Sequence, residues 1–150
     1  MRYAHTNIVS KDWKRLADFY IQVFRCELQP PERNQQGDWL SIGTGVPNAH
    51  LKGAHLLLPG HGPGGPTLEI YEYRDILDSN TAAPNRKGIG HLAFEVEDVR
   101  KVAKTLVNKG GSLYGEISEQ PIKGLGVLTF VYAQDPDGNL IELQNWSRKD

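Results

Sequence analysis

"GIGHLAFEVEDV", residues 88–99, is the most informative segment for the fold. It contains a histidine, a run in which apolar and polar residues alternate, and an acidic residue at its end. Alternation of apolar and polar residues predicts a half-buried β-strand, and an acidic residue after the strand can begin a helix. The N-terminal stretch "MRYAHTNIVSKDW", residues 1–13, has the same order of features. The two stretches therefore indicate an internal repeat.

The repeat extends into a helix in both copies. When the two stretches are superimposed, His5 falls on His91 and Asp12 falls on Asp98. Apolar residues follow each aspartate at helical spacing, and an aspartate can cap a helix by accepting the free N–H groups of the first turn. Gly110 is expected to end the second helix, because glycine readily adopts the left-handed conformation found there.

Strand-like runs follow each predicted helix. They are "DWLSIGT" (38–44), "AHLKGAHLLL" (49–58) and "TLEIYEY" (67–73) in the first half, and a weaker "SLYGEI" (112–117), "GVLTFVYAQ" (126–134) and "NLIELQNW" (139–146) in the second. The turn "DPDG" (135–138) joins the last two runs, with proline and glycine at the positions that a type I turn favours. Each half thus predicts a βαβββ module, and the chain an α+β fold with mixed, mainly antiparallel sheets.

Length and composition set limits on organisation and partners. We expect one domain made of module one (residues 1–77), a polar linker (78–88) and module two (89–150). The net charge of -1 gives no attraction to nucleic acid or to anionic membranes, and no apolar run approaches the ~18 residues of a membrane span. The single cysteine, Cys26, excludes an intrachain disulfide and favours a cytoplasmic location.

Strand alternation places one histidine and one glutamate of each half on the sheet face that points away from the helices. If the two sheets pair, they curl into a cup lined by two imidazoles and two carboxylates, a donor set that suits a divalent metal. The four candidate ligands are His5, Glu69, His91 and Glu142. The same face carries the candidate substrate-pocket residues Asn7, Tyr71, Tyr73 and Gln144.

The other three histidines lie in the first half. The run "PGHGPGGP", residues 59–66, predicts a flexible loop by composition. His50, His55 and His61 lie in or beside this loop, and we expect them to be surface or pocket-rim residues.

These runs, together with "WKRLADFYIQVF" (13–24) and "DPDGNLIELQNW" (135–146), resemble the vicinal oxygen chelate superfamily over nearly the whole chain. That superfamily includes glyoxalase I, methylmalonyl-CoA epimerase, extradiol dioxygenases and bleomycin resistance proteins. The resemblance implies paired βαβββ modules that form a cup around a divalent ion. Its ligand positions correspond to His5, Glu69, His91 and Glu142, a set most similar to that of bacterial glyoxalase I.

Two positions differ from the pattern of bacterial glyoxalase I. Val9 stands where that family has an arginine that holds glutathione, and Tyr73 stands where it has an asparagine. Both differences remove polar contacts to a glutathione tail. They count against strict use of glutathione and leave the metal ligands unchanged.

The expected function is that of a metal-dependent lyase or isomerase acting on a small molecule. A divalent ion (nickel, cobalt, zinc, manganese or iron) stabilises an enediolate, and Glu69 or Glu142 acts as general base, with Glu142 favoured by analogy. Three alternatives stay open: an iron-dependent extradiol dioxygenase using His5, His91 and Glu142, an epimerase similar to methylmalonyl-CoA epimerase, and a non-catalytic drug-binding protein. A homodimer is expected, because dimers are common in the superfamily, and the modules can pair within one chain or across two.

Overall fold

The first and last strands of each module lie side by side and parallel, and this pairing organises the whole chain. The computed structural model describes residues 1–78 and 81–147. The chain divides into two units, Met1–Ser79 and Asn80–Asp150. The division falls within the predicted linker 78–88. Ser79 and Asn80 of this linker lie outside the described residues, and so do residues 148–150 of the predicted second module.

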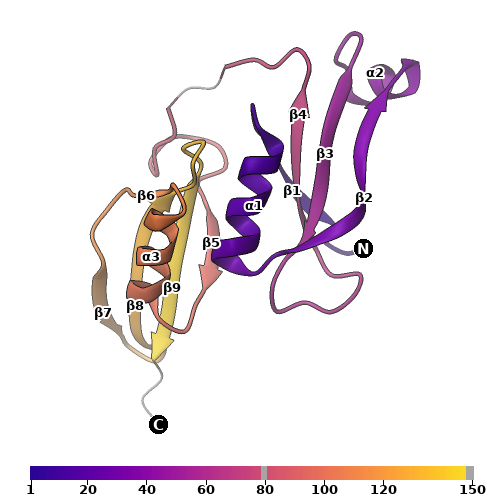
Figure 1. The fold of residues 1–150 in the computed structure, drawn as a ribbon. Helices are drawn as coiled ribbons and strands as arrows, with labels where there is room; N and C mark the ends of the chain where they lie inside the picture. Colours follow the sequence, from indigo (N-terminus) through magenta and orange to yellow (C-terminus); the bar gives the residue numbers. More distant parts are fainter. Residues whose placement is uncertain (79–80, 148–150) are drawn as a thin grey trace. The chain divides into compact units, whose positions relative to one another are not determined.

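The first unit has a four-stranded mixed sheet in the order β1-β4-β3-β2 (Figure 1). Strands β1 and β4 are parallel, whereas β2–β3 and β3–β4 are antiparallel. Its elements are β1 (His5–Val9), α1 (Trp13–Phe24), β2 (Glu27–Gln36), α2 (Asp38–Thr44), β3 (His50–Leu57) and β4 (Thr67–Tyr73).

The second unit repeats this plan with a five-stranded sheet. Strands β5 and β9 are parallel, β8 pairs with β9 in antiparallel fashion, and β6 and β7 both pair with β8. The α+β class and the mixed, mainly antiparallel sheets are thereby confirmed. The elements are β5 (Leu92–Glu95), α3 (Val99–Asn108), β6 (Ser112–Leu113), β7 (Ser118–Ile122), β8 (Gly126–Gln134) and β9 (Leu140–Ser147).

The predicted helix ends are confirmed. The Oδ1 atom of Asp12 accepts a hydrogen bond from the backbone N–H of Arg15 at 3.1 Å, and the Oδ1 atom of Asp98 accepts one from Lys101 at 3.0 Å. Each bond satisfies a backbone donor that the first helical turn leaves free. Gly110 follows α3 with a φ of 95°, the left-handed conformation that glycine adopts without strain.

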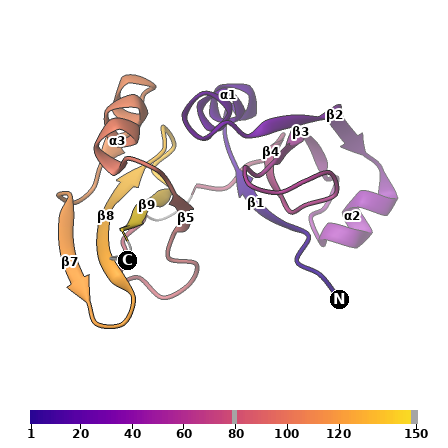
Figure 2. The same ribbon diagram turned by 90° about the horizontal axis from the view of Figure 1, so that it is seen from below.

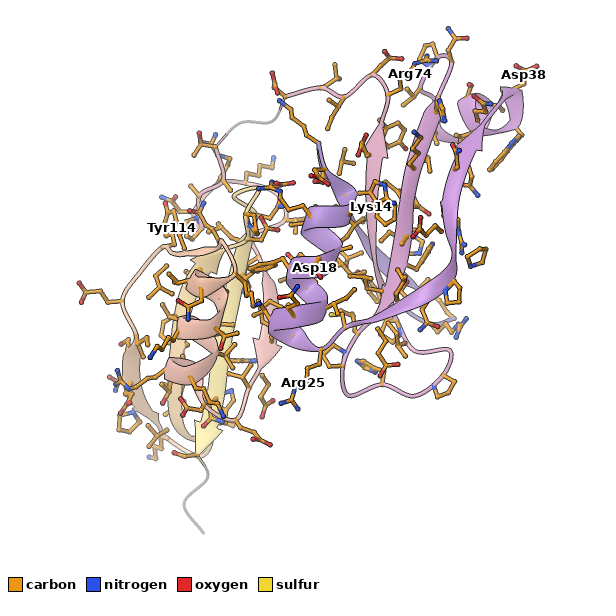
Figure 3. All side chains as sticks on the ribbon, viewed as in Figure 1. Lys14, Asp18, Arg25, Asp38, Arg74 and Tyr114 are labelled. Atoms are coloured by element: carbon orange, nitrogen blue, oxygen red, sulfur yellow. The ribbon has the colours of Figure 1, made fainter. Side chains whose placement is uncertain are left out.

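Each sheet has one face covered by a helix. In the first unit, Leu16 and Tyr20 of α1 and Ile70 of β4 are fully buried, whereas the charged side chains of Lys14 and Asp18 project from the outer side of α1 (Figure 3). In the second unit, α3 packs on β8 and β9. Its buried core contains Leu106, Val131, Ile141 and Leu143. The opposite face carries the histidine and glutamate side chains, and in the first unit Leu40 of α2 packs on part of it against Leu51.

Two predictions for the first unit were wrong. Residues 38–44 form the helix α2 and not a strand, because the backbone N–H groups of Leu40 and Ser41 both bond the carbonyl of Gly37 and so close a helical turn. Strand β2 was not predicted, because "ELQPPERNQQ" is polar and holds two prolines. It lies at the sheet edge, where proline is tolerated. Figure 2 shows α1 and α2 on opposite sides of this sheet.

Candidate functional site

Parallel pairing of β1 and β4 brings His5 and Glu69 together. Asn7 lies opposite Glu69 in this register, so His5 lies one pleat away on the same face. The Nε2 atom of His5 is 3.3 Å from the Oε2 atom of Glu69. The Glu69 side chain is only 12% exposed, whereas that of His5 is 44% exposed. The carboxylate is therefore held inside the sheet face, and the imidazole is open to a ligand.

His55 of β3 reaches the same carboxylate from the other side. It lies directly opposite Glu69 in the antiparallel β3–β4 pair, and its Nε2 atom is 2.9 Å from the Oε1 atom of Glu69. The Nδ1 atom of His55 is 2.9 Å from the hydroxyl of Thr67. The hydroxyl of Tyr71 donates a hydrogen bond to the same Oε1 atom at 3.2 Å. Glu69 is thus the centre of a hydrogen-bonded cluster.

Burial determines the direction in which the pKa values of His55 and Tyr71 shift. Desolvation lowers the pKa of His55, although the negative charge of Glu69 opposes this effect. Desolvation, followed by the charge and hydrogen bond of Glu69, raises the pKa of Tyr71 to about 12. At neutral pH the phenol therefore keeps its proton, and burial favours the neutral form of the imidazole.

Gly53 of β3 makes room for Tyr71. The two residues lie opposite each other in the β3–β4 register. A Cβ atom on Gly53 would lie 2.4 Å from Cδ1 of Tyr71 and 2.1 Å from the backbone oxygen of Ile70. These separations are far below van der Waals contact. Glycine at position 53 thus leaves space for the Tyr71 ring, whose hydroxyl reaches Glu69 on the same face of β4.

The second unit contains a corresponding pair, His91 and Glu142. Ala93 lies opposite Glu142 in the parallel β5–β9 pair, as Asn7 lies opposite Glu69 in the first unit. His91 comes two residues before Ala93, just as His5 comes two residues before Asn7. The Nε2 atom of His91 is 2.8 Å from the Oε2 atom of Glu142. The ring of His91 packs against that of Tyr132, with 4.9 Å between the centroids. Each unit thus pairs a histidine at or just before its first strand with a glutamate in its last strand.

The predicted pocket residues differ in their surroundings. Asn7 is exposed beside Glu69, and Tyr71 bonds directly to it. Tyr73 packs against a small buried cluster made of Leu40, Ala49 and Leu51. Gln144 accepts a hydrogen bond from the indole of Trp146 at 3.3 Å. Tyr73 and Gln144 therefore have structural contacts that the sequence did not indicate.

His55 was expected to be a surface or pocket-rim residue beside the glycine-rich loop. The structure places it within β3, in contact with Glu69, with a side chain that is 20% exposed. The sequence did contain a signal, because Ala54 and Leu56 are buried on the opposite face, and alternation then puts His55 on the face of Glu69. His50, in contrast, pairs with the amide of Asn34 at 2.8 Å, outside this cluster.

Metal-binding capacity depends on the donor atoms available. In residues 1–78 and 81–147, no group of three or more His, Cys, Asp or Glu side chains is placed to hold a metal ion by itself. Each His–Glu pair nevertheless offers one imidazole nitrogen and one carboxylate oxygen, ligands that suit zinc, nickel, cobalt and iron.

The chain is an α+β protein with two βαβββ-type modules. Each module has a histidine before or in its first strand and a glutamate in its last strand. The chain belongs to the Glyoxalase/Bleomycin resistance protein/Dioxygenase superfamily, whose family model matches residues 2–143. The described part of the chain has no helix long and apolar enough to cross a membrane.

Solved structures support this assignment at the level of the fold. A glyoxalase family protein from Bacillus cereus is similar with a TM-score of 0.84 and 23% identity, over 99% of this chain and 95% of that one. Glyoxalase I from Zea mays is similar with a TM-score of 0.65 and 28% identity, over 99% of this chain and 45% of that one.

A curated relative matches part of the sequence. The protein named "Probable lactoylglutathione lyase" of Synechocystis sp. (strain ATCC 27184 / PCC 6803 / Kazusa) is 43% identical over 65 residues. The match covers 42% of this chain and 47% of that protein, so it spans about half the length of the relative.

Proposed function

We propose that the chain is a metal-dependent lyase or isomerase similar to glyoxalase I, with His5, Glu69, His91 and Glu142 as ligands of one divalent ion. The observation that supports this most strongly is the pair of equivalent His–Glu contacts, at 3.3 Å and 2.8 Å, in two units of related topology. The pairs belong to one chain or to two chains of a homodimer. The metal is nickel, cobalt, zinc, manganese or iron.

The chemistry requires a carbonyl substrate that carries a neighbouring C–H group. When bound, a divalent ion acts as a Lewis acid, which makes that proton easier to remove. Glu142, acting as a base and not as a ligand during this step, is proposed to take the proton from the hydroxyl-bearing carbon and return it to the carbonyl carbon, while the hydroxyl proton passes to the carbonyl oxygen. Its side chain is 15% exposed, so water is largely kept away from the carboxylate during transfer.

The substrate is proposed to be a small α-hydroxycarbonyl compound. Asn7, Tyr71, Tyr73 and Gln144 share the site face of the two sheets and are the proposed pocket residues. Val9 is 44% exposed and offers an apolar surface near this face. A valine cannot bind a carboxylate, so the tail of glutathione is not held here through an arginine. The protein is proposed to act in the cytoplasm.

Metal analysis followed by an activity screen tests the proposal. The full chain, purified and loaded with each of the five metals, is assayed with glutathione hemithioacetals, acyl-CoA epimers and catechols. We expect stoichiometric metal and carbonyl isomerisation, and His91→Ala should lower the rate by more than about 100-fold, since even partners of metal ligands contribute 10–100-fold. His50→Ala is the matched control and should leave the rate unchanged.

The alternatives give different outcomes in the same screen. Oxygen uptake with catechols and an iron requirement would show a ring-cleaving dioxygenase. Activity restricted to acyl-CoA epimers would show an epimerase. A chain that cannot be loaded with any of the metals would be a binding protein, and the proposed function would then be wrong.

A further inference from the structure

The neighbours of Glu69 and Glu142 differ, although the two residues occupy equivalent positions. On the strand next to the glutamate, the directly opposite residue is His55 in the first unit and Tyr132 in the second. Two residues before each glutamate stand Thr67 and Leu140. The first unit therefore surrounds its glutamate with polar groups that the second unit replaces with an aromatic and an aliphatic side chain.

The hydrogen bonds of His55 determine which ring nitrogen carries the proton. An ionised carboxylate can only accept hydrogen bonds, so a hydrogen bond between Nε2 of His55 and Oε1 of Glu69, 2.9 Å apart, requires Nε2 to be the donor. The hydroxyl of Tyr71 is 3.2 Å from both atoms, and in this arrangement it donates to Oε1. In a neutral ring the Nδ1 atom is then an acceptor. The hydroxyl of Thr67, 2.9 Å from Nδ1, is a donor that meets this need. Thr67 thus stabilises the Nε2–H tautomer of His55.

The two oxygen atoms of Glu69 are consequently not equivalent. Oε1 accepts hydrogen bonds from His55 and from Tyr71. Oε2 faces His5, with 3.3 Å between it and the Nε2 atom. One oxygen is held by the protein, and the other is directed at the histidine that the proposed function makes a ligand.

Glu142 lacks such support in the described part of the chain. Its Oε2 atom contacts His91 at 2.8 Å. Tyr132, opposite Glu142, packs its ring on His91. The carboxylate of Glu142 is therefore less restrained than that of Glu69, which agrees with a role in proton transfer.

We infer that His55, oriented by Thr67, is a positioning residue that holds Oε1 of Glu69 and so presents Oε2 to the divalent ion. This inference rests on the proposed function, because it assumes that Glu69 is a ligand. His55 does not touch the substrate. Its effect on affinity comes from fixing the direction of one carboxylate before the ion binds, which reduces the ordering that binding requires.

The first test uses the full chain without metal. Long-range ¹H–¹⁵N spectra distinguish the two neutral tautomers of each histidine, and His55→Gln identifies the signals of His55 by their loss. We expect His55 to be the Nε2–H tautomer. A ring protonated on Nδ1 alone would overturn the inference, because Nε2 could then not donate to Glu69.

The second test measures the dissociation constant for Co²⁺ by titration calorimetry, with Co²⁺ as the probe. His55→Ala should weaken binding by about 10–100-fold, as removal of such partners does. His55→Gln, whose amide can donate from a similar position, should recover most of this loss. Thr67→Val should cause a smaller decrease than His55→Ala. Tyr132→Phe, the matched control on the second unit, should bind within about twofold of the wild type.

The outcomes separate the inference from the proposed function. Wild-type affinity in His55→Ala, with Co²⁺ still bound by the unchanged chain, would overturn the inference alone. Failure of the unchanged chain to bind Co²⁺ or any other of the five metals would overturn the proposed function as well. If His55→Ala does not fold, Thr67→Val decides the question. Co²⁺ affinity of Thr67→Val equal to that of the wild type would show that Thr67 does not orient His55, and the inference would be overturned.

Discussion

Gly53→Ala should destabilise the first unit strongly, because there is no space for even one methyl group at this position. The added Cβ would lie 2.1 Å from the backbone oxygen of Ile70 and 2.4 Å from Cδ1 of Tyr71. Van der Waals contact requires more than 3 Å, so β3 and β4 must separate by about 1 Å. The obstacle includes a backbone atom, which cannot turn away as a side chain can.

The expected loss of unfolding free energy in Gly53→Ala has two contributions. Overpacking of a rigid site costs about 1–3 kcal/mol, and strained ladder hydrogen bonds between β3 and β4 add about 1 kcal/mol. We expect a loss of about 3 kcal/mol in the free energy of unfolding. With a urea m-value of about 2 kcal/mol/M, the midpoint falls by about 1.5 M. Urea titrations followed by circular dichroism and tryptophan fluorescence measure this shift.

Gly43→Ala is the control for this measurement. Gly43 lies in α2, and a Cβ atom there meets nothing within 4 Å. Alanine is the better helix former, so this variant should gain about 0.5–1 kcal/mol. A Gly53→Ala protein within about 0.5 kcal/mol of the wild type would show that the strand pair adapts freely, and the packing account of Gly53 would be refuted.

Three further predictions concern the rest of the first unit. Asp12→Ala removes the side-chain cap of α1 and should cost about 1 kcal/mol of stability in urea unfolding; no loss would mean that the bond to Arg15 is replaced by water. Ile70→Ala should cost about 2–5 kcal/mol, because Ile70 is fully buried, whereas Ile42→Ala, at a residue 82% exposed, should change stability by less than about 0.5 kcal/mol. Burial raises the pKa of the Cys26 thiol from 9.0 to about 12, so the unfolded chain loses this proton first as the pH rises. The stabilising contribution is therefore complete below pH 9.0 and declines above it, and the unfolding free energy of the wild type should fall relative to Cys26→Ala by up to ~1.4 kcal/mol per pH unit between pH 9.0 and about 12.

The sequence predicts the repeated parts of this molecule well, because a repeat gives two observations of each pattern. The caps at Asp12 and Asp98 were visible as matched features, and so was the placement of one histidine and one glutamate of each half on the same sheet face. The His–Glu contacts needed one further assumption, that the first and last strands of each half are neighbours. That pairing could not be derived from alternation alone, since alternation fixes a face and not a partner strand.

Two features that the sequence did not reveal, helix α2 and the contacts of His55, are present in only one half. Helix α2 contains three apolar residues in a short run, which fits either a strand or a helix. The role of His55 depends on register, because a histidine bonds to a glutamate only when the strands align the two residues. Neither feature has a counterpart in the second half that would have drawn attention to it.

Parallel pairing of the first and last strand also has a consequence for folding. The atoms of each His–Glu pair are contributed by residues 5 and 69 in one unit and 91 and 142 in the other, so both contacts are distant along the chain. No local fragment can form them, and they arise only when a module closes at its outer boundary. The appearance of these contacts during refolding therefore reports the completion of each module.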